Sequence, residues 1–191
     1  MKPLSLALFV FGLAACSPLA HPNAAEVPSG VALRGTDGQM HDLRSEVAQA
    51  PATVLVFFDA SCPCMTAHEP RIKALRDELA SRGVRWFMVD SEEGGSIELD
   101  QGIAKDRGYA FPILLDENGK LARAMGAECA TYSVVLDRAG RVQYAGGIDD
   151  DRSHLRDDAT PYLHDALVDV LDGKSPRRPS GKALGCALKL W

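Results

Sequence analysis

Two cysteines, Cys62 and Cys64, stand between an apolar segment and a segment with helical periodicity. Residues 53–58 read Thr-Val-Leu-Val-Phe-Phe, a β-branched and aromatic run that is typical of a buried strand. Residues 65–82 repeat apolar side chains at helical spacing, which predicts a helix directly behind the cysteines. Because proline favours the first helical position, Pro63 makes Cys62 the expected N-cap and places Cys64 in the first turn. The pattern therefore predicts a strand that delivers two thiols to a helix N-terminus.

This position favours reactive thiols. The first turn of a helix presents unpaired backbone N–H groups and the positive end of the helix dipole. Both stabilise a thiolate, which is the nucleophilic and metal-binding form of cysteine. We therefore predict that Cys62 and Cys64 are catalytic, and we set aside the alternative that they pack only as small apolar side chains.

The N-terminus predicts export. Lys2 precedes an apolar stretch over residues 4–13, which has the length of a secretory signal and is too short to span a bilayer. The following Leu-Ala-Ala-Cys resembles the lipobox of bacterial lipoproteins, which implies a signal peptide over residues 1–15 and a lipid on Cys16. Ser17 implies sorting to the outer membrane, facing the periplasm. Cleavage at a nearby alanine, which would release a soluble protein, is the alternative.

The remaining chain is long enough for one domain. We expect a tether over residues 16–28, a domain over residues 29–172 and an extended strap over residues 173–191. The net charge of -5 argues against a nucleic-acid partner. Four cysteines remain for the folded part, and an even number in an oxidising compartment permits disulfides without specifying their pairing.

Strand and helix patterns alternate along the domain. This alternation, followed by a hairpin and a closing helix, predicts an α/β sandwich with a mixed sheet. We expect the acidic runs at residues 149–151 and 156–158 to be solvated loops. Calcium binding by these runs is the alternative. The predicted strands cover residues 31–34, 40–43, 53–59, 84–90, 111–116, 132–137 and 141–145, and the predicted helices cover residues 65–82, 97–107, 118–125 and 161–171.

Three motifs characterise the predicted domain: LRGTDG at residues 33–38, FPILLD at 111–116 and VVLD at 134–137. They resemble motifs of redoxins, the AhpC/TSA and TlpA-like extracytoplasmic proteins, and the resemblance covers residues 31–171. It implies a thioredoxin-like three-layer α/β/α sandwich, here with a C-terminal extension. It also implies a redox-active centre in an oxidoreductase or antioxidant of the cell envelope.

The chain departs from the usual thioredoxin-like motif, in which two residues separate the cysteines. Pro70 lies eight residues after Cys62, where the family has a helix-kinking proline. The resemblance thus assigns the nucleophile to Cys62, leaves Met65 at the usual resolving position and moves the second thiol to Cys64. A disulfide between Cys62 and Cys64 would close a small, strained ring, and strain makes a disulfide easier to reduce.

A second departure concerns the loop that faces the active site in this family. Thr131 occupies the position of a common cis-proline, and Cys129 replaces the arginine of a peroxiredoxin-like pattern. Residues 57–61 also lack the proline and threonine of the peroxiredoxin motif. We therefore expect weak peroxidase activity, although a thiol peroxidase stays a third alternative. Cys129 and Thr131 become auxiliary site candidates.

Metal binding is the alternative from a different functional class. Cys62, Cys64, His68 and Cys129 would form a soft site for Cu(I) or Zn(II), as in a periplasmic copper-binding module. His68 follows Cys64 by four residues and shares its helical face. Thiol–disulfide exchange needs no cofactor, whereas the second hypothesis requires a bound metal ion.

We predict thiol–disulfide exchange with client proteins or small molecules. Cys62 attacks a client disulfide, and Cys64 resolves the mixed disulfide, with Cys129 or Cys186 as alternatives. Cys186 could instead staple the C-terminal strap to the domain. The expected partners are client thiols or disulfides, an envelope redox partner and the membrane that holds the lipid anchor.

Overall fold

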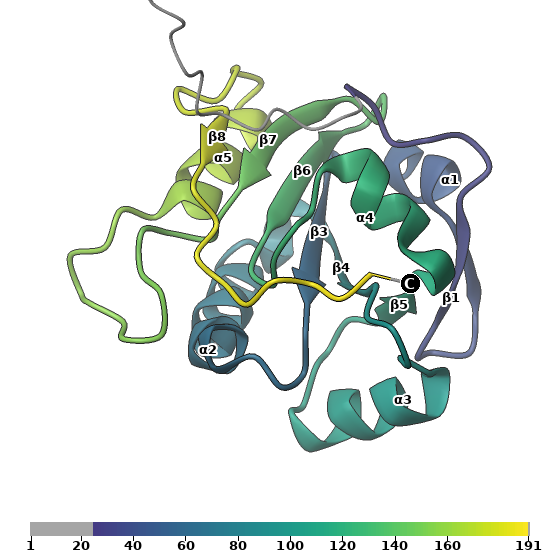
Figure 1. Cartoon of the computed structure of the whole chain (residues 1–191). Helices are drawn as coiled ribbons and strands as arrows, with labels where there is room; N and C mark the ends of the chain where they lie inside the picture. The colour runs from purple at the N-terminus through teal and green to yellow at the C-terminus, as the bar shows by residue number, and fades with distance from the viewer. Residues whose placement is uncertain (1–24, 191) are drawn as a thin grey trace, which may run out of the picture.

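The computed structural model describes residues 25–190, and they fold around one mixed sheet (Figure 1). The eight strands lie in the order β2-β1-β5-β4-β3-β6-β7-β8. Central strand β3 runs parallel to β4 and antiparallel to β6. The strands are β1 (Ala32–Gly35), β2 (Met40–Asp42), β3 (Ala52–Phe58), β4 (Arg85–Asp90), β5 (Ile113–Leu115), β6 (Ser133–Asp137), β7 (Val142–Gly146) and β8 (Ser180–Gly181).

Helices cover both faces of this sheet. One apolar cluster joins the sheet to α2, α3 and α5, and the other joins it to α1 and α4. Strand β3 supplies both clusters because its side chains alternate: Val56 belongs to the first and Phe57 to the second. The helices are α1 (Leu43–Ala48), α2 (Pro63–Glu78), α3 (Ile97–Asp106), α4 (Lys120–Met125) and α5 (Tyr162–Leu171). The predicted three-layer α/β/α sandwich is confirmed.

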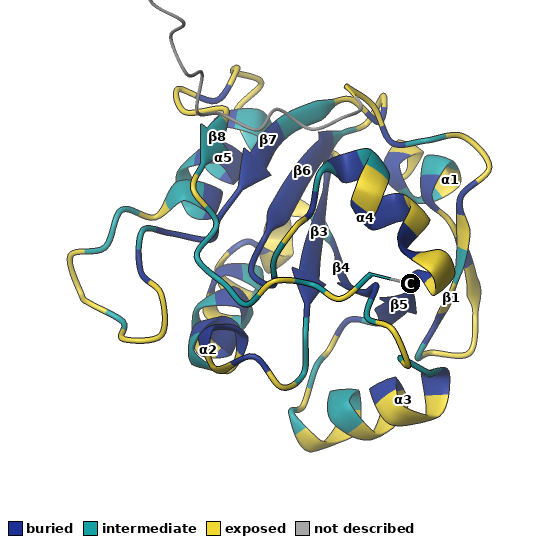
Figure 2. Ribbon diagram, viewed as in Figure 1, coloured by how far each residue is buried: buried dark blue, intermediate teal, exposed yellow. Residues whose placement is uncertain are grey.

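Burial follows the apolar runs of the sequence. All seven residues of β3 are buried, and the inner strands form the dark centre of the molecule in Figure 2. Such a strand reads as a continuous apolar run because helices cover it on both sides. The sequence-based prediction of a buried strand before the cysteines is therefore confirmed.

Three local features differ from the prediction. Helix α1 begins at Leu43, the last residue of a predicted strand, and continues over residues to which no element was assigned. Asp42 is its N-cap and accepts a hydrogen bond from the Ser45 backbone. Helix α2 ends at Glu78, and a separate 3₁₀ turn, Ala80–Arg82, precedes a left-handed Gly83. The C-terminal strap contributes the short strand β8, which pairs in parallel with β7.

The C-terminal segment folds back over the domain. In Figure 1 the yellow segment leaves β8, passes the end of β3 near α2 and finishes close to β5. Among residues 25–190, no helix is long and apolar enough to cross a membrane. The predicted signal peptide and lipid site Cys16 lie outside the described residues.

Candidate active site

The turn between β3 and α2 presents the two cysteines as predicted. Cys62 has extended backbone angles (φ -74°, ψ 117°) and is the N-cap of α2, and Pro63 opens the helix. The backbone N–H of Cys62 donates to the Asp59 carbonyl at 3.1 Å, which closes the turn. The Cys62 carbonyl then accepts from Thr66 at 3.0 Å, in the first turn of the helix.

A third thiol reaches this turn from the C-terminal segment. The backbone N–H of Cys186 donates to Sγ of Cys62 over 3.3 Å. The sulfur atoms of Cys62, Cys64 and Cys186 all lie within 4.8 Å of one another. We call these three residues the thiol cluster. The site therefore combines two segments of the chain, because Cys62 and Cys186 are 124 residues apart in the sequence.

Hydrogen bonds from the strap, residues 173–190, to the loop before β6 fix the third thiol. The backbone N–H of Ala130 donates to the Cys186 carbonyl at 2.9 Å, and the backbone N–H of Leu188 donates to the Glu128 carbonyl at 3.0 Å. Gly185 makes this approach possible, because a Cβ atom there would lie 1.7 Å from the Ala130 carbonyl oxygen. A residue with a side chain at position 185 would push the strap, and Cys186 with it, off this loop.

The electrostatics of the cluster single out Cys62. Burial raises its pKa, but hydrogen bonds from the Cys186 thiol and from backbone N–H groups outweigh burial, so the net pKa is lowered. The shared hydrogen bond has the opposite effect on its donor and raises the pKa of Cys186 to about 12. The Cys62 thiol is thus the more acidic of the pair, and the Cys186 thiol is the hydrogen-bond donor.

Access to the cluster is restricted. Cys62 is 0% exposed and Cys64 is 5% exposed, whereas Cys186 is half-buried. The strap therefore covers Cys62 in this conformation, and a large molecule can reach its sulfur only after residues around Cys186 have moved.

The remaining predicted site residues lie around the cluster. Cys129 is half-buried on the loop beneath the strap but is not one of the three clustered sulfurs, and burial raises its pKa. Thr131 is buried in a left-handed conformation (φ 75°), which is unusual for a β-branched residue, and its N–H donates to Phe57 at 3.0 Å. The described chain has no cis peptide bond, so Thr131 holds the loop against β3 with a trans backbone.

His68, a predicted metal ligand, makes two hydrogen bonds within the domain. Its Nδ1 donates to the Cys64 carbonyl at 2.7 Å, and its Nε2 faces Asp149 at 2.9 Å. Both ring nitrogens are therefore engaged with oxygen atoms. Although burial lowers the pKa of His68, the hydrogen bonds to Asp149 and Cys64 raise it overall. With both nitrogens engaged in this way, His68 is not among the ligand atoms grouped at the cluster.

The acidic loop after β7 is also different from the expectation of a solvated segment. Asp149 and Asp151 are 3% and 4% exposed. Arg71 of α2 donates to Asp149 at 2.5 Å and to Asp151 at 2.9 Å, and Arg156 donates to Asp151 at 2.6 Å. With His68, these side chains form an ionic network around two buried carboxylates, and this network joins α2 to the loop. Sequence reasoning missed it because a run of aspartates carries no local sign of burial.

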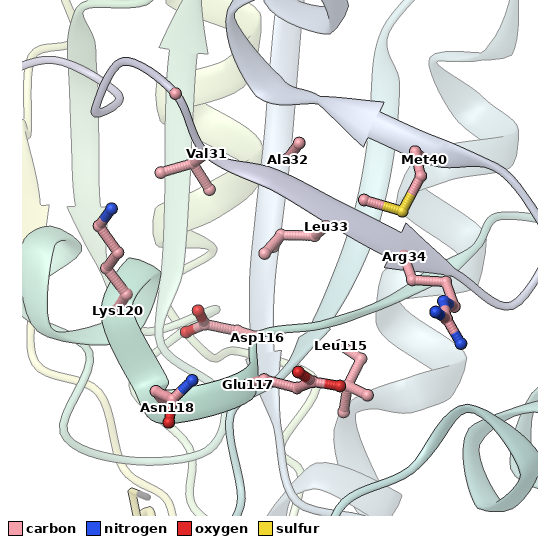
Figure 3. A pocket seen from close by; sticks show the side chains of 11 residues that line it. Val31, Ala32, Leu33, Arg34, Met40, Leu115, Asp116, Glu117, Asn118 and Lys120 are labelled. Atoms are coloured by element: carbon pink, nitrogen blue, oxygen red, sulfur yellow. The ribbon is translucent and has the colours of Figure 1, made fainter.

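A separate hollow lies beside β1 (Figure 3). It is lined by residues of β1, β2 and the segment after β5, including Arg34, Asp116 and Lys120, and by no cysteine. The Asp116 carboxylate accepts from the backbone of Leu121 and Ala122 and from Ser91, so it is engaged in holding α4. The hollow is therefore separate from the thiol cluster.

Comparison with known proteins identifies the family. The family model named Redoxin matches residues 22–160. The chain belongs to the Redoxin family. This redoxin matches no protein in a search of curated sequences.

Solved structures agree with this assignment. An uncharacterized conserved protein from Geobacillus kaustophilus is 27% identical with a TM-score of 0.76, and the match covers 87% of this chain and 90% of that one. A hypothetical protein from Sinorhizobium meliloti 1021 is 26% identical with a TM-score of 0.76, covering 87% and 93%. Peroxiredoxin Q from Xanthomonas campestris is 20% identical with a TM-score of 0.56, covering 83% and 98%, and supports the fold alone. The predicted thioredoxin-like fold is confirmed, and the family supports a thiol oxidoreductase in general.

Proposed function

We propose that this redoxin is an extracytoplasmic thiol–disulfide oxidoreductase in which Cys62 is the nucleophile. The observation that carries the proposal is the hydrogen-bonded pair of Cys62 and Cys186 at the N-terminus of α2. One thiol of the pair is stabilised as a thiolate, and the other holds a proton beside it. A nucleophile next to a second thiol is the arrangement that exchange requires.

The reaction needs no cofactor. The Cys62 thiolate attacks one sulfur of a client disulfide, the client S–S bond breaks, and the released client sulfur leaves as a thiolate. A second cysteine of this chain then loses its proton to solvent or to the leaving sulfur and attacks Cys62. This step breaks the mixed disulfide and frees the second client thiol. The client gains two electrons, and this chain is left with an internal disulfide.

Cys186 is the better resolving residue of the two that lie near Cys62. A disulfide to Cys64 would close a small ring stiffened by Pro63, with a cost in strain. A disulfide to Cys186 joins distant segments and carries no such ring. We therefore place Cys186 before Cys64 in this role, reversing the order suggested by the spacing of the cysteines alone.

Peptide mapping tests this order. We expect the protein, oxidised by one equivalent of a small disulfide, to contain a Cys62–Cys186 disulfide with Cys64 and Cys129 alkylatable. Cys129→Ser should give the same map, because Cys129 lies outside the thiol cluster. A predominant Cys62–Cys64 disulfide would refute the assignment of Cys186.

The peroxidase alternative has less support. Peroxide reduction needs fixed donors that orient the peroxide and stabilise the leaving oxygen, and loss of one such donor costs about a hundredfold in comparable sites. The donors at Cys62 are backbone N–H groups and the Cys186 thiol. They already donate to the Cys62 sulfur, so they are not free to orient a peroxide. The strap also covers Cys62, which is fully buried.

We place the enzyme in the bacterial cell envelope, held by a lipid on Cys16 and facing the periplasm, with the outer membrane as its expected location. Cys16→Ala should abolish incorporation of a labelled fatty acid and leave an unprocessed precursor, because lipidation requires that sulfur. Cys129→Ser is the matched control and should be labelled and processed as the wild type is. Equal labelling of wild type and Cys16→Ala would contradict the anchor.

A further inference from the structure

The thiol cluster has a ligand geometry that disulfide exchange does not require. Exchange needs two sulfurs, whereas three sulfurs from two distant segments lie within 4.8 Å of one another. Metal–thiolate bonds of about 2.3 Å in a trigonal arrangement place sulfurs about 4 Å apart, so small side-chain movements suffice for all three to reach one ion. We propose that the reduced cluster of Cys62, Cys64 and Cys186 is a binding site for a single Cu(I) ion.

The donor set selects Cu(I) over harder ions. All three ligand atoms are cysteine sulfur, which binds metals as thiolate and favours Cu(I), zinc and iron–sulfur centres over magnesium, calcium or manganese. Zinc favours a fourth ligand, and the nearest imidazole is unable to supply one because both nitrogens of His68 are engaged. Among residues 25–190, the grouping contains no histidine and no carboxylate. Three sulfurs without a fourth ligand match the low coordination that Cu(I) accepts.

The surroundings suit an anionic metal–thiolate group. The helix N-terminus of α2 and the N–H of Cys186 face the sulfurs and stabilise negative charge. Two of the ligands are buried, which protects Cu(I) from water and oxidant, while half-buried Cys186 leaves a route for the ion. Binding replaces the thiol protons, which pass to solvent, and involves no change in oxidation state.

This inference goes beyond the proposed function, and the strap connects the two. The strap brings Cys186 to the turn because Gly185 allows contact with Ala130. Displacing the strap would remove one ligand without removing any sulfur from the protein. Cu(I) on the cluster would also block exchange, because the nucleophile would be a ligand.

Competition between the reduced full-length protein and the Cu(I) chelator bathocuproine disulfonate, under nitrogen, tests the site. We expect one Cu(I) per chain, and Cys186→Ser should weaken binding at least about tenfold, the low end of losses for residues that only support a ligand. Gly185→Ala should weaken binding in the same way although every sulfur is retained. Cys129→Ser, which removes a nearby sulfur outside the cluster, should bind as the wild type does.

Wild-type affinity in Cys186→Ser would overturn the proposal. So would an equal loss in Cys129→Ser, or displacement of Cu(I) by a modest excess of Zn(II). Metal-free insulin reduction on the same preparations separates this inference from the proposed function. If exchange persists and Cu(I) binding is absent, only the copper site is refuted.

Discussion

Replacing Cys62 with serine should reduce the rate of insulin disulfide reduction at least about 1,000-fold, to the background given by dithiothreitol alone. The hydroxyl of serine keeps the N-cap position of α2 but is not ionised at neutral pH, so no nucleophile remains there. The measurement is the rate of insulin precipitation with metal-free protein. Cys62→Ser should keep the wild-type thermal unfolding midpoint within a few degrees.

Cys129→Ser is the matched control for this experiment. Cys129 also lies near the strap, and burial raises the pKa of its thiol, so the thiol is protonated at neutral pH. We expect Cys129→Ser to retain most of the activity. A variant pair in which Cys129→Ser is inactive and Cys62→Ser is active would reverse the roles assigned to these two residues.

Replacing Asp149 with alanine should lower the free energy of unfolding by about 3–5 kcal/mol, the cost of removing one partner from a buried ion pair. Asp149 is 3% exposed and accepts hydrogen bonds from His68 and Arg71. Its removal leaves the buried His68 ring and the Arg71 guanidinium without their shared partner. Urea unfolding at neutral pH measures the loss.

Asp158→Ala is the control for this prediction. The Asp158 side chain is 86% exposed and lies 3.9 Å from Arg156, so its loss should cost less than about 1 kcal/mol. A similarly small cost for Asp149→Ala would show that the network contributes little to stability.

The same network predicts how stability depends on pH. The pKa of His68 is raised in the folded state, so its contribution is complete below the unfolded value of 6.5 and is lost as pH rises through the folded pKa. The pKa of Asp149 is lowered, so its contribution is present above the unfolded value of 3.8 and is lost as pH falls through the folded pKa. The stability difference between wild type and Asp149→Ala should therefore be largest between these limits.

Local patterns in the sequence predicted the parts of the site that are local in structure. The apolar run of β3, the helix behind it and the proline after Cys62 involve neighbouring residues, so their spacing predicted the strand, the N-cap and the first turn. The fold class followed from alternating strands and helices, which depend on the same short-range periodicity. The family resemblance supplied the three-layer arrangement, which periodicity leaves open.

Local sequence patterns did not predict the contacts between segments that are distant in the sequence. Cys186 was one of three candidate resolving residues, and its approach to Cys62 depends on a backbone contact of Gly185 that no local pattern encodes. The burial of Asp149 depends on Arg71 and His68, which lie 78 and 81 residues away. Strand β8 has only two residues, too few for a strand pattern.

Trapping the mixed disulfide tests the central claim most directly. The double variant Cys64→Ser/Cys186→Ser removes both nearby sulfurs, so a mixed disulfide on Cys62 would persist because nothing near it could resolve it. After reaction of the reduced variant with oxidised glutathione and an acid quench, mass spectrometry of its peptides should find glutathione on Cys62, with Cys129 still a free thiol. Glutathione on Cys129 with Cys62 unmodified would contradict the assignment of Cys62 as the nucleophile.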